Sequence, residues 1–430
     1  MHAGQIVRSA RKAANMTLAE LGERCGYSAA QVSRYERGLT RLTDITLLGT
    51  FAAVLNIPPA ALGLSAAGDS PSAAESPDFP PGSRSVAAVD DSGKEDPVRR
   101  RSLLLGAGLA APAALLARVD AALAIMPAPS TRASAAGVTA LLAHARAEFD
   151  DGRLTALARR LPELLAVGHD LHDQSPGDEA HLALLAGCYD LASEALHKSG
   201  SPQAARISAD RAVTYARLSG DPAAEGMAAR SLAVVLRHEG RPELAAAVTR
   251  TAADRLTASG LGSTRTANTL AQVLCTAAYS AAQAGNHCEA DVMITEARDI
   301  AGRTTADLTE VPPLTITPAQ ATLYQVGIWW SLGEPGKALH AARGLRPAQF
   351  PTPERKARLF TDMARVWDQA GKPDRAISAL LSATSHAPSE VRDRPSIRTL
   401  ALGLVRSHPS AAGAGQLSGV LGGSERWRRG

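Results

Sequence analysis

The 430-residue sequence has few aromatic residues, few cysteines and no apolar run long enough to span a bilayer. Aromatic residues make up 3% of the chain, alanine is abundant and β-branched residues are sparse, which favours helices over sheets. The four cysteines form no C-x-x-C pair, and no Cys/His cluster has zinc spacing, so the sequence predicts neither a metal site nor a cofactor. We expect reduced, buried thiols of a cytoplasmic protein at Cys25, Cys188, Cys275 and Cys288.

Catalytic motifs and a strong excess of one charge are also missing. The formal net charge is +4 at pH 7, so any surface that binds a polyanion must be local. The sequence contains no H-E-x-x-H, G-x-S-x-G or G-x-x-x-x-G-K-[ST] motif, and its eleven histidines are scattered, so we do not expect an enzyme. The opening MHAGQIVRSARKAANMT is polar and amphipathic and is not expected to be a signal peptide.

The first 64 residues predict five short helices around one small core. Apolar spacing places them within residues 3–15, 18–25, 29–37 and 44–55 and from Pro58 onward. In the first helix Ile6, Val7 and Ala10 share the apolar face, and Arg8, Arg11 and Lys12 lie off it. The second helix is preceded by a capping box of Thr17 and Glu20.

A glycine turn at Gly26 joins the second helix to the third, and two short helices joined in this way form a helix-turn-helix. The stretch TLAELGERCGYSAAQVSRYERG, from Thr17 to Gly38, resembles the phage-repressor (Xre-type) helix-turn-helix family over about 60 residues. The resemblance implies that the third helix lies in the DNA major groove. Gln31 can then pair with adenine and Arg34 with guanine. The candidate DNA-binding residues are Thr17, Ser28, Ala29, Ala30, Gln31, Ser33, Arg34, Arg37 and Arg41.

The charge of this region suits DNA, because residues 1–64 carry seven Lys/Arg against four Asp/Glu. Two departures from the family pattern should weaken the DNA binding of a single copy. Leu18 stands where the family often has a phosphate-binding glutamine, and Ala29 and Ala30 can offer at most a methyl contact to thymine. We therefore expect a homodimer on a double-stranded DNA operator with two half-sites. The alternative is a helix-turn-helix that only packs against a protein.

Two unusual segments follow. Residues 65–98 are rich in Pro, Ser, Gly and Asp and are expected to form a disordered linker. Residues 99–127 begin RRRSLLLGAGLAAPAALLARVDAALA, which resembles a twin-arginine export signal but does not begin the chain. The stretch G106-A-G108-L-A-A111 matches a dinucleotide fingerprint but lacks the required alternation of strand and helix. We expect an apolar helix that caps the next domain; the alternative is membrane association, which we regard as unlikely.

A repeat dominates the rest of the chain. A glycine is followed five residues later by an alanine, at a spacing of about 40 residues, in Gly200/Ala205, Gly240/Ala245, Gly285/Ala290, Gly333/Ala338 and Gly371/Ala376. Other small or apolar residues recur seven positions after each alanine, up to Leu345 and Ala383, and seven positions before each glycine. Glycine there stops one helix, and the small residues let two antiparallel helices approach closely.

This pattern resembles the tetratricopeptide repeat, whose usual length is about 34 residues. Five units are clear between residues 180 and 409, and helices near 132–149 and 153–171 add a sixth. Each unit cannot bury its apolar face alone, so residues 132–409 are expected to stack into one solenoid. Residues 410–430 form a basic C-terminal tail.

The resemblance implies a concave face that is lined by the first helix of each unit and binds a peptide or a protein. Counting back from each glycine by 13, 10, 6 and 3 residues gives the matching positions. The candidate ligand-binding residues there are Asp190, Glu194, Arg230, Arg237, Gln272, Tyr279, Gln320, Trp330, Arg358 and Arg365. The four arginines could hold a carboxylate or an acidic segment, and the two carboxylates could hold a basic end.

The sequence thus predicts an all-α protein with a five-helix helix-turn-helix domain and a tetratricopeptide-like solenoid. The joint architecture resembles actinobacterial-type regulators of transcription that fuse these two parts, and it implies a solenoid that dimerises and senses its ligand. The alternative is a non-enzymatic interaction scaffold, associated with a membrane through the apolar segment.

Overall fold

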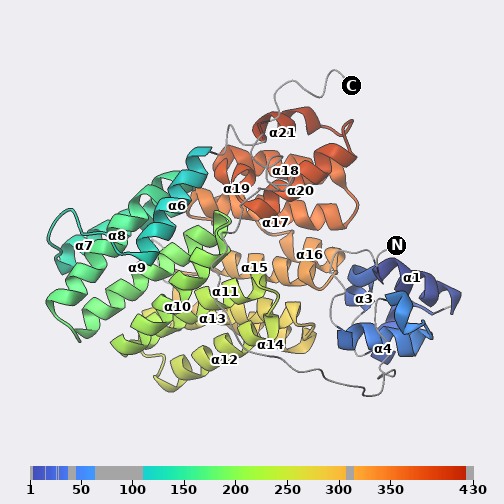
Figure 1. Cartoon of the computed structure of the whole chain (residues 1–430), viewed down its shortest axis with the longest axis horizontal. Coiled ribbons are helices and arrows are strands. Elements are labelled where there is room, and N and C mark those ends of the chain that lie inside the picture. The colour runs from blue at the N-terminus through green and yellow to red at the C-terminus, as the bar shows by residue number, and fades with distance from the viewer. Residues whose placement is uncertain are drawn as a thin grey trace, which may run out of the picture. The chain divides into compact units, whose positions relative to one another are not determined.

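The computed structural model describes residues 3–14, 16–25, 27, 29–36, 45–62, 110–306 and 314–422. Every regular element in these ranges is a helix, so the all-α prediction is confirmed. The chain divides between residues 107 and 108 into two compact units, whose helices are labelled in Figure 1. We call residues 3–62 the first unit and residues 110–422 the solenoid.

The first unit contains the five predicted helices. They are α1 (Ala3–Ala13), α2 (Leu18–Cys25), α3 (Ala29–Glu36), α4 (Ile45–Leu55) and the 3₁₀ helix η1 (Pro59–Leu62). The core contains one fully buried side chain from each of the four α-helices, namely Val7, Leu21, Val32 and Phe51, with other apolar side chains around them. Short helices such as these are marginal alone, so this shared core holds them in place.

The predicted capping box before α2 is confirmed. The hydroxyl oxygen of Thr17 accepts a hydrogen bond from the N–H of Glu20 at 3.2 Å, and the Glu20 carboxylate accepts one from the N–H of Thr17 at 2.7 Å. Two backbone donors that a helix start leaves without partners are thereby satisfied.

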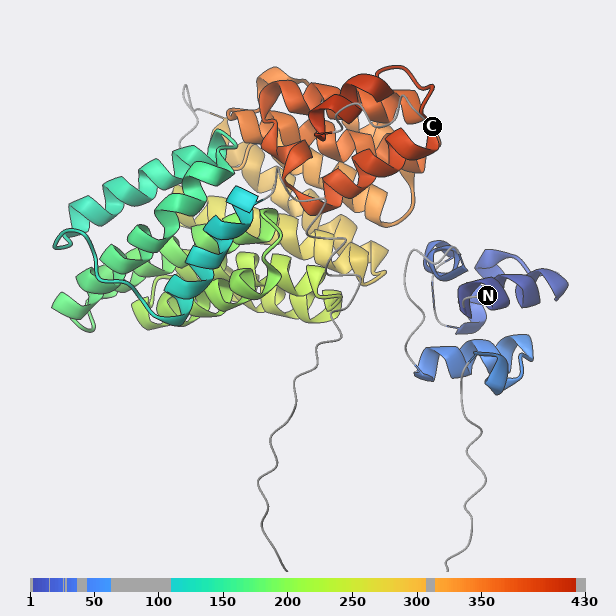
Figure 2. The ribbon, with the colours of Figure 1, turned by 45° about the horizontal axis from the view of Figure 1, so that its top comes forward.

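The solenoid is built from consecutive helical hairpins, which Figures 1 and 2 show stacked side by side. After α6 (Ala110–Ala124) the pairs are α7 (Ala135–Asp150) with α8 (Leu154–Gln174), α9 (Glu179–Lys198) with α10 (Pro202–Ser219), α11 (Pro222–His238) with α12 (Pro242–Ala258), α13 (Thr264–Gln283) with α14 (His287–Thr305), α15 (Pro318–Ser331) with α16 (Pro335–Ala342), and α17 (Pro353–Gln369) with α18 (Pro373–His386). The 3₁₀ helix η2 (Pro347–Gln349) precedes α17, and α19 (Ser389–Arg392), α20 (Pro395–Ser407) and α21 (Ala414–Val420) complete the described chain.

The repeat has the backbone conformation that its glycines predict. Gly200, Gly240, Gly285, Gly333 and Gly371 all have φ between 69° and 85°, the left-handed region that favours glycine. The alanine five residues after each of these glycines is fully buried. One position differs: α16 ends at Ala342, so the half-buried Leu345 lies beyond the helix, because Gly344 and Pro347 end it early.

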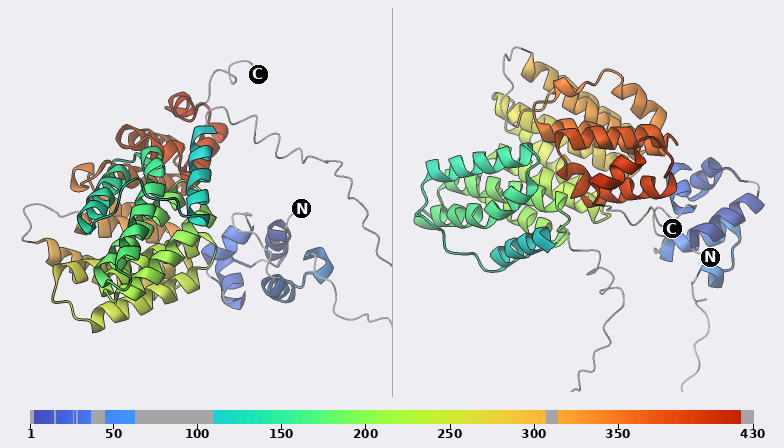
Figure 3. Two further views of the ribbon diagram at one scale, coloured as in Figure 1. Left: turned by 60° about the vertical axis from the view of Figure 1, so that its left-hand side comes forward. Right: turned by 90° about the horizontal axis from the view of Figure 1, so that it is seen from above.

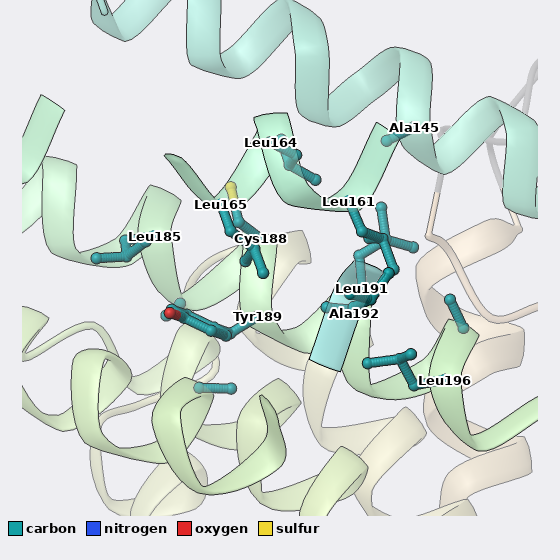
Figure 4. Close-up of a cluster of buried hydrophobic side chains, with 14 of the residues drawn as sticks. Ala145, Leu161, Leu164, Leu165, Leu185, Cys188, Tyr189, Leu191, Ala192 and Leu196 are labelled. Atoms are coloured by element: carbon teal, nitrogen blue, oxygen red, sulfur yellow. The ribbon is translucent and has the colours of Figure 1, made fainter. Parts of the chain in front are cut away.

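The largest apolar cluster joins the first hairpins. Figure 4 shows Leu161, Leu164 and Leu165 of α8 facing Leu185 and Leu191 of α9, with small residues between them. Cys188, Cys275 and Cys25 are buried as predicted, but Cys288 is exposed. The prediction for Cys288 was wrong. This residue lies in the first turn of α14, two positions before the buried Ala290, and therefore on a different side of the helix from the packed face.

Helix α6 packs on the solenoid. Its Val119 and Leu123 are buried in the same cluster as α8 and α9, and Arg211 Nη2 donates a hydrogen bond to the Leu123 carbonyl at 2.8 Å. Among the described helices, none combines the length and apolar character needed to cross a bilayer. The expectation that residues 99–127 cap the next domain stays a prediction, and residues 99–109 lie outside the described ranges.

The two ends of the solenoid meet. Helix α17 contacts α7, and Figures 1 and 3 show α6 beside the C-terminal helices. Ser389 Oγ donates a hydrogen bond to the Gly152 carbonyl at 2.6 Å. A Cβ at Gly200 would lie 2.6 Å from Cγ of Pro395, so the turn of the second hairpin touches the start of α20.

A buried ion cluster, here called the clasp, lies at this junction. Lys198 at the end of α9 bonds the carboxylates of Glu354 on α17 and Glu390 on α19, the latter at 2.5 Å, and its ammonium lies 4.7 Å from the Phe149 ring centroid. Burial alone would raise the pKa of Glu354, but Lys198 outweighs it and the pKa falls to about 2. The solenoid therefore closes on itself through charge pairs that join its second hairpin to α17 of the last hairpin and to α19.

Candidate nucleic-acid interface and inner face of the solenoid

Helix α3 is the predicted recognition helix, and its packed face is as expected. Val32 is fully buried and Tyr35 is 9% exposed. Gln31 and Arg34 are part of α3, but their side chains, with those of Ala29 and Ala30, lie outside the described part of the structure. Ser28, Arg37 and Arg41 also fall outside the described residues. Ser33 is half-buried, and Thr17 is exposed with its hydroxyl engaged in the capping box.

A buried ion pair fixes the C-terminal end of α3. Arg11 of α1 donates to both carboxylate oxygens of Glu36, at 2.5 and 2.8 Å, and to the Met16 carbonyl at 2.7 Å. The hydrogen bond to Glu36 raises the pKa of Arg11. The prediction that Arg11 lies off the packed face was wrong, because its partner is 25 residues away and helical spacing alone does not reveal it.

Three aromatic rings connect the turn of the motif to α4. The ring centroids of Tyr27 and Tyr35 are 5.9 Å apart and those of Tyr35 and Phe51 6.1 Å, both edge-to-face. The C-terminal end of α3, at Tyr35 and Glu36, is thus held by α1, by α4 and by the turn of the motif.

The ten candidate ligand residues come from α9, α11, α13, α15 and α17, the first helix of each hairpin. Their contacts place them on one shared inner face. Glu194 of α9 bonds Arg230 of α11 at 2.6 Å and Arg146 of α7 at 2.7 Å, so three consecutive first helices are joined by one carboxylate. Asp190 accepts from the Ser231 hydroxyl at 2.5 Å.

This environment shifts the pKa values of Asp190 and Glu194 in opposite directions. Burial, followed by the nearby charge of Glu194, raises the pKa of Asp190 to about 6. Burial alone would raise the pKa of Glu194 too, but Arg146 and Arg230 outweigh it and the pKa lies well below its usual value. Glu194 is therefore an ionised structural partner of two arginines.

The arginines of α17 share one carboxylate. Asp362 bonds Arg358 at 2.9 Å and Arg365 at 3.3 Å. The Arg365 guanidinium also lies 5.2 Å from the Trp330 ring centroid, a cation–π contact between α17 and α15. The ring centroid of Trp329, its neighbour in the chain, instead lies 4.6 Å from the ammonium of Lys337 on α16, so the two tryptophans contact different helices.

Arg237 differs from these arginines. Its guanidinium lies 4.5 Å from the centroid of the Tyr279 ring on α13, but its Nε and Nη1 atoms are buried and have no hydrogen-bond partner among the described residues. Burial lowers its pKa to about 10. Tyr279 is held in turn by Gly327 of α15, where a Cβ would lie 2.6 Å from the ring.

Both candidate glutamines hydrogen-bond within the solenoid, Gln320 locally and Gln272 over a long sequence distance. Gln272 donates to the Leu314 carbonyl at 2.8 Å, and Gln320 forms a capping box with Thr317 at the start of α15. The capping box is visible in the sequence as T-x-x-Q, whereas the contact of Gln272 with residue 314 spans 42 residues and has no local signal.

Four inner-face residues were not among the predicted ones: Arg146, Tyr324, Arg355 and Asp362. Arg146 lies six residues before Gly152, the same offset that selects Glu194 from Gly200. Gly152 has φ 72° and follows α7, the first helix of the first hairpin, so the counting rule finds Arg146 once that hairpin is included. Tyr324 and Asp362 share another offset, nine residues before their glycines.

Comparison with known proteins bears on the first unit alone. Residues 7–62 match a helix-turn-helix family, which spans α1 to η1 and contains α2 and α3 as the motif. No curated protein and no solved structure matches the chain.

Proposed function

We propose that this protein is a sequence-specific transcriptional regulator whose solenoid controls how the first unit binds DNA. The match of residues 7–62 to a helix-turn-helix family is the observation that carries DNA binding and transcription regulation. The C-terminal end of α3 is held by the Arg11–Glu36 pair and by the Tyr27–Tyr35–Phe51 rings, which supports a preformed reading helix.

We further propose that the protein binds DNA as two copies and that a ligand controls this binding. Two copies bind an inverted repeat, with half-sites about 34–36 Å or a multiple of that apart, because one copy offers few base contacts. The repeats are of the tetratricopeptide type, and a peptide or protein contacts the inner face through its arginines and aromatic side chains. Ligand binding then changes the spacing of the two reading helices and so their fit to the operator.

The reading role of α3 is tested by selecting bound duplexes from a random library with full-length protein. We expect the wild type to enrich an inverted repeat. Gln31→Ala with Arg34→Ala should lower discrimination about 30-fold or more, since each bidentate base contact is worth about 1–3 kcal/mol.

The chain provides a matched control for this test. Gln5 and Arg8 of α1 have the same side chains at the same spacing and are exposed. Gln5→Ala with Arg8→Ala should keep the selected sequence. If the α3 double variant selects the same sequences as the wild type, α3 does not read bases, and the interaction-scaffold alternative is favoured.

A further inference from the structure

A polar cavity lies at the seam where the two ends of the solenoid meet. It has a volume of about 210 Å³, and Arg146 and Asp150 of α7 face Thr352 and Arg355 of the α17 region across it. The rest of its wall is formed by residues 314–316, Pro351, Gln272 of α13, and Gln320 and Tyr324 of α15. A second, much smaller hollow shares Tyr324 and Arg355 and extends to Tyr279 and Arg358. The cavity is thus built from both ends of the repeat array.

The charges of three arginines act on Tyr324, which lines this cavity. Burial alone would raise the pKa of the Tyr324 phenol, but Arg230, Arg355 and Arg358 outweigh it and the pKa falls below its usual value. Asp150 is the carboxylate that lines the cavity among the described residues, and burial raises its pKa.

Arg355 has unused hydrogen-bonding capacity. Its only charged neighbour within 4 Å in the described part of the chain is Glu354, with Nε 3.4 Å from Oε2, and that oxygen has no hydrogen-bond partner. Glu354 is already bonded by Lys198 in the clasp. A guanidinium has five N–H donors in a planar fork that matches a carboxylate or a phosphate. Arg237, whose Nε and Nη1 atoms are buried without a hydrogen-bond partner among the described residues, packs on Tyr279, which lines the smaller hollow.

The size of the cavity restricts the occupant. With the clasp closed, a space of about 210 Å³ takes a compact group and not an extended polypeptide. The shared chemistry of the groups that fit is one or two negative charges on a small planar or tetrahedral centre.

We propose that this cavity binds a single compact anionic group, a carboxylate or a phosphate, between Arg355 of α17 and Arg146 of α7 with the Tyr324 hydroxyl as a third contact. The proposal rests on the proposed ligand-sensing role of the inner face and names the chemistry it recognises. An anion held by arginines from both ends adds a further link across the seam. The group is either a free anion or the carboxylate end of a chain.

The test is titration calorimetry of the full-length protein at constant ionic strength with chloride as the background anion. The probes are inorganic phosphate, N-acetyl-trialanine with a free carboxylate, and its C-terminal amide. We expect saturable binding of phosphate or of the free-carboxylate peptide, and none of the amide. Arg355→Gln should lower the affinity for the anion at least about tenfold, as the loss of a charge-assisted hydrogen bond predicts.

The exposed Arg241 at the start of α12 provides the matched control, and Arg241→Gln should leave binding unchanged. If Arg355→Gln fails to fold, Tyr324→Phe removes one donor while keeping the ring, and weaker binding is expected again. Absence of saturable binding of both anions, or equal binding by wild type and the cavity variants, overturns the proposal.

The duplex selection described above separates this proposal from the proposed function. Saturable anion binding that does not alter DNA binding supports the cavity and contradicts the sensing role. Selective DNA binding without any saturable anion binding leaves the DNA reader intact and removes the cavity.

Discussion

Arg11 illustrates how one residue can position a functional element without contacting its target. The side-chain exposures of Arg11 and Glu36 are 11% and 4%, so this pair is largely removed from water. The fork of Arg11 matches both oxygens of Glu36, the last residue of α3, and its third contact is the turn between α1 and α2. The pair therefore fixes the orientation of the C-terminal end of α3 relative to α1.

We predict that Arg11→Met destabilises the first unit by about 3 kcal/mol, because it leaves a buried carboxylate without its partner. Amide hydrogen exchange of the full-length protein, followed by mass spectrometry, measures this as faster exchange of α1 and α3. Arg8→Met on the same helix is the control, since Arg8 is exposed and forms no described ion pair. Unchanged exchange in α3 after Arg11→Met contradicts the role assigned to the pair.

The repeating structural unit of the solenoid is a hairpin of two antiparallel helices. Its positive-φ glycine ends the first helix, and the following buried alanine lets the second helix pack closely. The five glycines have the same backbone conformation but different surroundings. A Cβ at Gly285 would meet nothing within 4 Å, whereas one at Gly200 would lie 2.6 Å from Pro395 Cγ.

Alanine variants of these two glycines distinguish the energetic cost of backbone strain from the cost of disturbing the contact that closes the solenoid. Gly285→Ala should cost about 1–2 kcal/mol in free energy of unfolding, the cost of a left-handed conformation for a residue with a Cβ. Gly200→Ala should cost more, since it has the same strain and also pushes α20 away from the first hairpins. Urea denaturation of the two variants measures both values, and equal losses would mean that the Gly200–Pro395 contact contributes nothing.

Closure is a property of the whole solenoid. Lys198 is separated from Glu354 by 156 residues and from Glu390 by 192, yet the three side chains form one buried cluster. Arg394 adds a contact to Glu390 at 3.3 Å. The anion cavity lies on the same seam, so closure and ligand binding are coupled if the cavity is occupied.

We predict that Lys198→Met lowers the free energy of unfolding by about 3–5 kcal/mol and enlarges the radius of gyration in small-angle scattering, because two buried carboxylates lose their partner. Lys337→Met is the control, since that exposed lysine pairs with Glu334 on the surface and should cost less than about 1 kcal/mol.

The effect of Lys198→Met should depend on pH. The pKa of Glu354 is about 2 in the folded protein, below its ordinary 4.5. Its pairing with Lys198 therefore stabilises the fold fully above pH 4.5, and this contribution is lost as pH falls towards 2. The difference between wild type and variant should narrow across that window; a constant difference would show that the charge of Glu354 is not involved.

The sequence by itself determined the local features. The all-α class, the five helices of the first unit, the Thr17 capping box and the glycine stops follow from spacing, propensity and backbone freedom within a few residues. The counting rule also selected residues that share the inner face, because the phase of a repeat fixes which side of each first helix points inward.

Only the tertiary structure decided the long-range pairings. Arg11 with Glu36, the clasp at Lys198, and the meeting of Arg146 and Arg355 at one cavity have no local signal. Closure depends on the small rotation between successive hairpins, which accumulates over the whole array before its ends meet. A periodic sequence specifies each step, but whether the final step brings α17 back to α7 depends on the sum of all of them.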